Sequence, residues 1–200
     1  MTYKVKKVGI IVQRRELFDN KLLISKLWET ERMIIRDANL QDVDRLQEIY
    51  MQSKSTEGWT RDDGSTTDYI LNGVIKGNLP SDGKKEFYRI QLITHKNSSV
   101  IMGFIEYYHG YPEKDILYMA TLLLSEKYRN KGFGQEIMNR LFNQALELGF
   151  QQVRLGVSLK NWQGVYFWTK LGFSRIIKFC GDKVFAKDSF AVLELEKDLS

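Results

Sequence analysis

Hydrophobic residues recur along this 200-residue chain at two spacings, every second position and every third or fourth, which are the periods of strands and helices. The helical spacing predicts helices over residues 17–28, 39–50, 133–148 and 162–171. The other spacing predicts strands over residues 4–12, 33–35, 88–92, 100–108, 116–124, 153–157, 173–179 and 190–195. The polar stretch 53–83 contains a short hydrophobic patch at 69–75 and is expected to be a long loop or a helix with loops around it.

The order of these elements predicts the fold class. Three strands in succession, 88–92, 100–108 and 116–124, interrupt the alternation of strand and helix. A purely alternating chain would give a parallel sheet, so this order predicts an α/β (α+β) domain with a mixed central β-sheet flanked by helices. Because the run 116–124 is hydrophobic on both faces, it is expected to be the central strand.

Composition narrows the function classes. The net charge of +5 is a mild excess that suits an anionic cofactor, and the lysines are scattered without interleaved aromatic residues, so no nucleic acid is expected as a partner. One cysteine and two histidines allow no disulfide and predict no metal site. Cys180 itself is expected to be a buried, inert thiol. The longest N-terminal hydrophobic run, Val8 to Val12, is too short for a signal peptide or membrane span, so we expect a cytoplasmic protein without membrane contact.

A glycine turn between the run 116–124 and the helix 133–148 has the features of a phosphate site. Backbone N–H groups and the helix dipole attract anions at such a turn, and Gly132 and Gly134 let the backbone approach the anion without a Cβ. The dinucleotide fingerprint is excluded because Ile137 occupies its third glycine position, and no Walker loop occurs. A plain surface turn is the alternative. The residues expected to bind the anion are Arg129, Asn130, Lys131, Gly132, Phe133, Gly134 and Gln135.

The pattern Arg-x-x-Gly-x-Gly resembles the acetyl-CoA pyrophosphate loop of the GNAT N-acetyltransferase superfamily. About thirty residues later, the segment Asn161–Phe173 resembles the second motif of that family. The resemblance covers residues 32 to about 195 and implies a GNAT acyltransferase domain at 32–200. Residues 1–31 precede it as an extension. This extension is expected to pack as an extra strand and helix on the domain or on the second subunit of a homodimer, with a tail as the alternative.

The resemblance implies that acetyl-CoA donates its acetyl group directly to a primary amine, without an acyl-enzyme. Leu122, Leu123 and Leu124 match the strand whose backbone pairs with the pantetheine arm. Backbone amides near Leu124 would polarise the thioester carbonyl. Asn161 matches a side chain that bonds the cofactor arm or the acceptor, and a simple helix cap is the alternative.

The sequence departs from the family pattern at Gly164, where alanine is usual, and at Trp168, where a tyrosine often stands as the proposed acid. An indole N–H is no usable acid. Tyr166 is the nearby replacement, although two residues along a helix turn it toward another face. For the base we name Glu106 and Tyr118, with a solvated strand residue and a core ring as the alternatives.

The acceptor is expected to be a small cationic amine, either a small molecule or a peptide amine. Trp59, Asp62 and Asp63 in the polar stretch place an aromatic ring beside carboxylates, which suits a cation, and an ordinary solvated loop is the alternative. A second reading of the whole chain is a non-catalytic acyl-CoA-binding or regulatory protein that keeps the fold without turnover.

Overall fold

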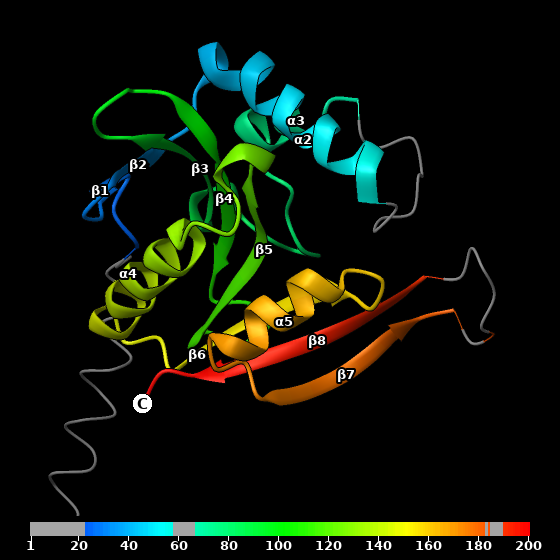
Figure 1. Ribbon diagram of the computed structural model, residues 1–200. Helices are drawn as coiled ribbons and strands as arrows, with labels where there is room; N and C mark the ends of the chain where they lie inside the picture. The colour runs from blue at the N-terminus through cyan, green and yellow to red at the C-terminus, as the bar shows by residue number, and fades with distance from the viewer. Residues whose placement is uncertain (1–22, 58–66, 183, 185–189) are drawn as a thin grey trace, which may run out of the picture.

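The structure is a computed structural model that describes residues 23–57, 67–182, 184 and 190–200. Eight strands form one sheet in the order β1-β2-β3-β4-β5-β6-β8-β7 (Figure 1). The strands are β1 (Leu27–Glu29), β2 (Met33–Asp37), β3 (Tyr88–His95), β4 (Ile101–His109), β5 (Ile116–Leu124), β6 (Gln152–Ser158), β7 (Arg175–Gly181) and β8 (Ala191–Asp198). The α-helices are α2 (Val43–Glu57), α3 (Tyr69–Ile75), α4 (Phe133–Glu147) and α5 (Trp162–Lys170), with 3-10 turns η1 (Leu40–Asp42), η2 (Lys85–Phe87) and η3 (Glu126–Tyr128).

The sheet is mixed, as the order of elements predicted. Strands β5 and β6 run parallel and are joined through α4, whereas the other neighbouring pairs in the sheet are antiparallel. Strand β5 lies in the interior of the sheet and coincides with the hydrophobic run 116–124. The strand and helix on either side of the predicted phosphate turn therefore form as expected.

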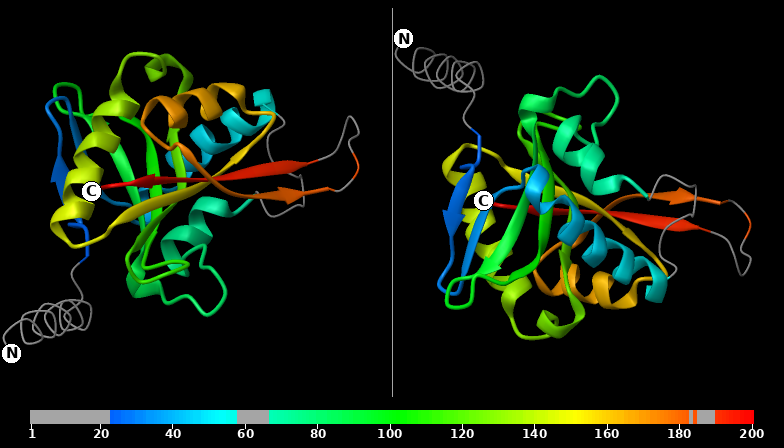
Figure 2. Two further views of the ribbon diagram at one scale, coloured as in Figure 1. Left: turned by 90° about the horizontal axis from the view of Figure 1, so that it is seen from below. Right: turned by 90° about the horizontal axis from the view of Figure 1, so that it is seen from above.

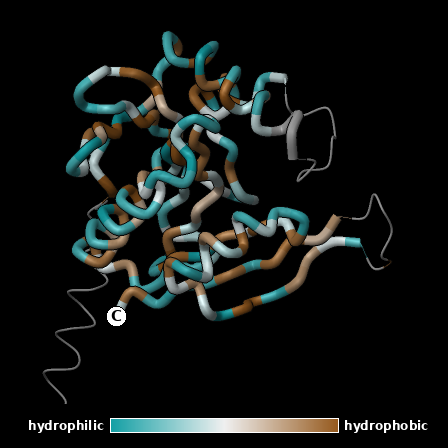
Figure 3. Tube along the Cα trace, in the orientation of Figure 1, coloured by the Kyte–Doolittle hydropathy of each residue, from teal (hydrophilic) through white to brown (hydrophobic). Residues whose placement is uncertain are grey.

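Helices cover both faces of the sheet (Figure 2). One core contains residues of α4, such as Ile137 and Leu141, together with Trp168 of α5. The other contains Leu46 of α2 and Ile70 of α3. Hydrophilic and hydrophobic positions alternate along the helices, so that one side of each is available to the sheet (Figure 3). The helix that starts at Asn39 begins as η1, where Asn39 and Asp42 form a capping box.

The predicted helix 17–28 is wrong at its C-terminal end. Leu27 and Trp28 belong to β1, which pairs antiparallel with β2 at the edge of the sheet. Trp28 is buried, and its Nε1–H donates to Gln91 Oε1 at 2.7 Å. Pairing with a neighbouring strand here overrides a helical spacing that is only a local preference. Residues 23–26 are not helical either, whereas residues 17–22 and the strand predicted at 4–12 lie outside the described residues.

The polar stretch 53–83 contains more regular structure than a loop. Helix α2 continues to Glu57, and the hydrophobic patch forms α3, which buries Ile70 in the core. The helical alternative is therefore confirmed for residues 69–75. The burial of one side of this short patch supplies the stabilisation that its polar flanks lack.

Candidate active site

Strands β5 and β6 separate halfway along their length. Their parallel pairing runs from Ile116↔Gln152 to Met119↔Leu155 and ends there. Beyond that point β5 stays paired with β4 as far as Leu124, and β6 stays paired with β8 as far as Ser158. The facing edges of residues 120–124 and 156–158 are therefore left without a strand partner, which is the arrangement that strand addition by an amide-bearing ligand requires.

A β-bulge lies where the two strands separate. Glu106 pairs with Thr121 and Tyr107 with Met119, so Ala120 is the extra residue on β5. A bulge bends its strand and increases the local twist. The bulge also changes which face of the sheet the following side chains occupy. In a regular strand, residues three apart lie on opposite faces, but Met119 and Leu122 both contact the α4 core.

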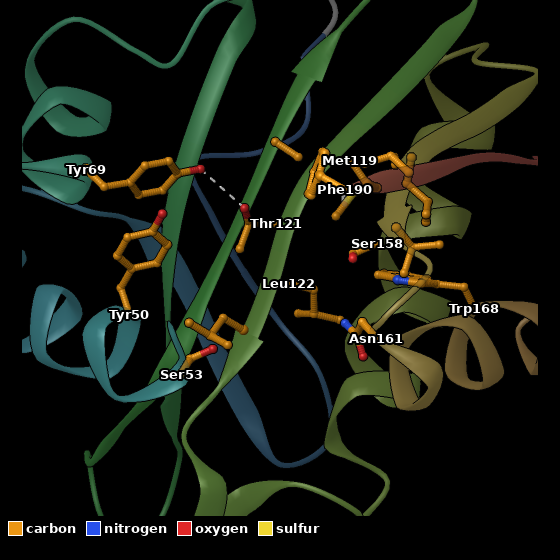
Figure 4. Close-up of a pocket in the computed structure, with 16 residues that line it drawn as sticks. Tyr50, Ser53, Tyr69, Met119, Thr121, Leu122, Ser158, Asn161, Trp168 and Phe190 are labelled. Carbon is orange, nitrogen blue, oxygen red and sulfur yellow. Dashed lines mark hydrogen bonds between the residues drawn. The ribbon is translucent and has the colours of Figure 1, made fainter. Parts of the chain in front are cut away.

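A cavity of about 370 Å³ fills the opening between the strands, and we call it the strand cavity. Tyr50 and Tyr69 approach it from one side, while Asn161 and Trp168 approach it from the other (Figure 4). Leu122 and Leu123 of the predicted pantetheine strand line it, together with Ala120 and Thr121. Leu124 is buried instead, and its carbonyl accepts a hydrogen bond from Arg129 Nε at 2.9 Å.

The glycine turn leads directly from β5 to the first turn of α4. Asn130 and Gly132 both adopt positive φ, at 58° and 81°. Gly132 is the N-cap of α4 and provides no side-chain cap, so the first N–H groups of the helix lack that partner. Uncapped N–H groups at the positive end of a helix dipole favour an anion.

Gly134 has a packing role that the sequence did not indicate. A Cβ at this position would lie 3.1 Å from Phe167 Cζ and 3.8 Å from Leu122 Cδ2. The first of these distances is shorter than ordinary van der Waals contact, so glycine at 134 lets α4 pack closely against α5. Glycine at position 134 therefore has a steric reason, contact with Phe167, besides the expected approach of an anion.

Arg32, which precedes β2, contacts the glycine turn and the first turn of α4. Its backbone N–H and Nε donate to the carboxylate of Glu136, at 2.9 and 2.6 Å. Its guanidinium donates to the carbonyl of Lys131 at 3.3 Å and stacks on the ring of Phe133, 4.2 Å from the centroid. Burial opposes ionisation of Glu136, but hydrogen bonds from Thr30 and Arg32 lower its pKa below the usual value. Arg32 was missed because about a hundred residues separate it from the turn.

Asn161 caps α5 and lines the strand cavity at the same time. Its Oδ1 accepts from the Gly164 N–H at 2.7 Å, so the cap interpretation holds as structure. A Cβ at Gly164 would lie 2.5 Å from Asn161 Nδ2, so the alanine that is usual in the family would require the Asn161 side chain to shift. Trp168 lines the cavity as well and packs edge-on against Phe167 and Phe173.

The two tyrosines named as catalytic candidates lie elsewhere. Tyr166 is 69% exposed on the outer side of α5 and does not line the strand cavity. Tyr118 lines a second cavity of about 280 Å³ with Tyr88, Tyr108 and Tyr111, which we call the tyrosine cavity. Burial and the charge of Glu194 raise the pKa of Tyr118 to about 12.

Glu106 is fully buried, so the alternative of a solvated strand residue is wrong. Its carboxylate accepts hydrogen bonds from the hydroxyls of Tyr69 and Tyr88 and from Asn78 Nδ2, the last at 2.8 Å. These three donors are neutral, and within the described residues no lysine, arginine or histidine forms an ion pair with Glu106. Tyr69 lies in the stretch that was expected to be loop or helix, and no sequence pattern marked it.

The remaining expectations have different outcomes. Trp59, Asp62 and Asp63 lie outside the described residues. Cys180 is exposed on β7, so the expected burial of its thiol is wrong. The reason is that β7 is the edge strand of the sheet and six of its seven residues are exposed. Within the residues that the structure covers, there is no cluster of three His, Cys, Asp or Glu side chains suited to a metal. None of the helices described is long and apolar enough to cross a membrane.

Known proteins resemble this chain in sequence or in architecture. Residues 44–173 match the Acetyltransferase (GNAT) family. An L-ornithine N5-acetyltransferase of Arabidopsis thaliana is 28% identical over 104 residues, which cover 48% of this chain and 46% of that protein. The match thus spans about half the length of that relative.

Among solved structures, a probable GNAT acetyltransferase from Chromobacterium violaceum has a TM-score of 0.67 at 12% identity, with 88% of each chain covered. A protein from Streptococcus mutans has a TM-score of 0.62 at 22% identity, covering 83% of this chain and 99% of that one. At these identities the likeness concerns the fold. Together with the family match over residues 44–173, it shows that the chain belongs to the GNAT acetyltransferase family.

Proposed function

We propose that this protein transfers the acetyl group of acetyl-CoA directly to the primary amine of a small cationic acceptor. The observation that carries the proposal is the strand cavity together with two features that lie next to it in the fold. Its wall is the unpaired edge of β5, the glycine turn and the N-terminus of α4 follow that strand, and the buried carboxylate of Glu106 lies on the next strand.

The residues of the cavity fit acetyl-CoA. The edge of residues 120–124 offers backbone donors and acceptors to the amides of a pantetheine arm. The glycine turn and the uncapped start of α4 suit its pyrophosphate. The bound thioester supplies an activated acetyl group, and backbone N–H groups near Leu124 would stabilise the negative charge on its carbonyl oxygen during attack.

The charge distribution favours a cationic acceptor. The carboxylate of Glu106 accepts hydrogen bonds from neutral donors, and Lys85 interacts with its charge without an ion pair, so we expect the carboxylate to attract an ammonium group at the adjoining cavity as well. Tyr50 and Tyr69 stack with ring centroids 4.3 Å apart and offer aromatic faces to a cation. The similar Arabidopsis protein is named for ornithine, an amine of this kind. The acidic residues Asp62 and Asp63, with Trp59, remain candidates for the same task.

The reaction needs two proton transfers, one to the leaving thiolate and one from the acceptor amine. The absence of a tyrosine at position 168 affects the first, which is the less costly one. Releasing a thiolate with pKa about 8.5 at pH 7 costs roughly 2 kcal/mol, whereas presenting an alkyl ammonium of pKa about 10.4 as a free amine costs roughly 4.6 kcal/mol. Removal of the amine proton is therefore the step that most needs a protein group. Trp168 can shape the cavity without acting as an acid.

The test is to incubate the full chain with acetyl-CoA and a panel of amines and to measure release of free thiol. The panel contains ornithine, spermidine, a lysine peptide and a neutral aromatic amine of similar size. We expect release with the aliphatic cationic amines and a lower kcat/KM for the neutral one. If calorimetry shows CoA binding while no amine releases thiol, the protein is the acyl-CoA-binding or regulatory alternative. Cytoplasmic location and a homodimer stay predictions.

A further inference from the structure

Glu106 is too deeply buried to take a proton from an acceptor directly. Its side chain is 0% exposed, and it is not among the residues that line the strand cavity. Any proton that reaches this carboxylate from the cavity has to pass through a group that touches both. Within the part of the chain that the structure describes, the donors to Glu106 are the hydroxyls of Tyr69 and Tyr88 and the amide of Asn78. A tyrosine hydroxyl can accept one proton while it donates another.

Tyr69 is the donor that meets this condition. Its ring lines the strand cavity, and its hydroxyl donates to Glu106 Oε2. The same oxygen lies 3.4 Å from Thr121 Oγ1, next to the bulge in β5 (Figure 4). Tyr50 stacks almost parallel to the ring, at 11° between planes, and holds it in this orientation.

Tyr88 and Asn78 lack one part of this arrangement. Both donate to Glu106 Oε1, but both line the tyrosine cavity instead of the strand cavity. Among the described residues that donate a hydrogen bond to the carboxylate, Tyr69 alone lines the cavity between β5 and β6. Tyr88 is therefore a natural control, because it has the same chemistry toward Glu106 from a different position.

We propose that Tyr69 takes a proton from the acceptor amine and passes its own hydroxyl proton to Glu106. This inference rests on the proposed acetyl transfer. The acceptor enters as an ammonium. One of its N–H protons moves to Tyr69 Oη as the Tyr69 proton moves to Glu106 Oε2, which leaves a neutral amine. The amine nitrogen attacks the thioester carbon, so a C–N bond forms and the nitrogen becomes positive. The C–S bond breaks, CoA leaves as a thiolate, and the thiolate takes the extra proton of the nitrogen through water. Glu106 then returns its proton to water through Tyr69.

The pKa of Tyr69 and its hydrogen bond to Glu106 suit a relay, a group that passes on a proton. Burial and the neighbouring charge of Glu106 raise the pKa of Tyr69 well above its usual value, so the ring does not remain deprotonated as a base. The hydroxyl can only exchange one proton for another, and Glu106 is the acceptor to which it is already hydrogen-bonded. A similar path through Tyr88 would lead to the tyrosine cavity.

The experiment compares Tyr69→Phe with Tyr88→Phe in the full chain. Tyr69→Phe keeps the ring and its stack on Tyr50 but removes the hydroxyl. We expect kcat to fall by about a hundredfold or more, the usual scale for general base catalysis, with CoA affinity by calorimetry unchanged. The remaining activity should rise with pH, because hydroxide then removes the proton. Tyr88→Phe should lose less than about tenfold, and Tyr166→Phe, on the exposed side of α5, should match the parent protein.

A double variant separates the relay from a merely structural role. Since Tyr69 acts through Glu106, adding Tyr69→Phe to Glu106→Gln should cost less than about threefold more, because residues that act as a unit are not additive. Equal losses in Tyr69→Phe and Tyr88→Phe, or an unchanged pH profile in Tyr69→Phe, would overturn the relay. If Tyr69→Phe fails to bind CoA, Thr121→Val takes its place, because it removes the hydroxyl that lies 3.4 Å from Tyr69 Oη. Fully additive losses of kcat in Thr121→Val and Glu106→Gln would then overturn the relay. Lack of turnover in the parent protein would instead refute the proposed function.

Discussion

His109 illustrates how a single residue carries long-range structure in this fold. Its ring is buried, and Nε2 accepts the N–H of Ile24 at 3.1 Å. Nε2 is therefore unprotonated, so Nδ1–H donates to the Phe87 carbonyl at 2.6 Å. The neutral ring connects the segment before β1 to the start of β3. Burial lowers the pKa of His109 to about 4.

Stability should fall when the pH is lowered from about 6.5 to about 4. The unfolded chain takes up the proton first, because its histidine pKa is near 6.5 and that of folded His109 is about 4. The contribution of this residue is complete above pH 6.5 and decreases by roughly 3 kcal/mol across the window. Urea unfolding at several pH values measures it. His109→Gln should flatten the slope in that window, and a parallel curve for the variant would contradict this assignment.

For single residues, the residue type suggested a chemical role, but the position of the side chain depends on the fold. Glu106 lies inside a strand as expected, but Glu194 and Glu196 of β8 do so too. The complete burial of Glu106 and its tyrosine partners depend on β3, α3 and Asn78. Tyr166 is in the expected motif, yet its exposed position removes it from the cavity. Residue identity therefore indicated chemistry without indicating access.

At the scale of elements, α4 is positioned by two contacts at its N-terminal end. Phe167 of α5 packs against Gly134, and Arg32 from the turn before β2 binds Glu136 and the carbonyl of Lys131. Both contacts hold the glycine turn beside the end of β5. The proposed phosphate site thus depends on elements that are remote in sequence.

Gly134→Ala should destabilise the protein by about 1–3 kcal/mol, because the added methyl group would overlap Phe167. Thermal and urea unfolding measure the loss. Phe167→Leu in the same chain should restore part of the stability by making room. If the double variant is stable and binds CoA as the parent does, the steric reason for glycine is sufficient. A stable double variant with weak CoA binding would mean that Gly134 also serves the anion.

Arg32→Gln should raise the Kd for CoA about tenfold, equivalent to about 1.4 kcal/mol, because it removes the ion pair and the ring stack that hold the turn. Calorimetry measures the affinity. Arg45→Gln is the matched control, since it makes the same substitution at another arginine and removes only an exposed ion pair with Glu48. Equal affinities for both variants would show that the turn keeps its conformation without Arg32.

At the scale of the whole molecule, the division at residue 31 does not coincide with a boundary of the fold. Ile24 is 1% exposed and belongs to the same core as α4, and β1 extends the sheet. Leu27–Glu29, which precede that division, form the edge strand β1. The proposed GNAT unit at 32–200 is completed by residues that precede it.

Two truncations test this. Deletion of residues 1–22 keeps Ile24, Trp28 and β1, and this truncation is the reference. Deletion of residues 1–31 removes Ile24 and Trp28 from the core and should cost at least about 3 kcal/mol, a typical loss for large buried side chains. Melting temperatures and thiol release distinguish the two. Identical behaviour of both truncations would mean that the edge strand contributes nothing to the domain.

The sequence by itself determined the elements around the glycine turn and the family to which they belong. The limits of β5, α4 and α5 agree with the hydrophobic spacing to within about a residue, because helix and strand periods and uncapped helix starts are local properties of the chain. The motif Arg129–Gly134 is likewise contiguous, so it is visible without any knowledge of the fold.

Only the tertiary structure decided the bulge at Ala120, the contact of Tyr69 with Glu106 and the position of Arg32 at the turn. Each depends on residues that are far apart in sequence and meet through strand pairing or helix packing. A single extra residue in β5 changes which side chains face the cavity, and no local pattern encodes such a shift. Spacing along the chain therefore determines the elements, and pairing between them determines the site.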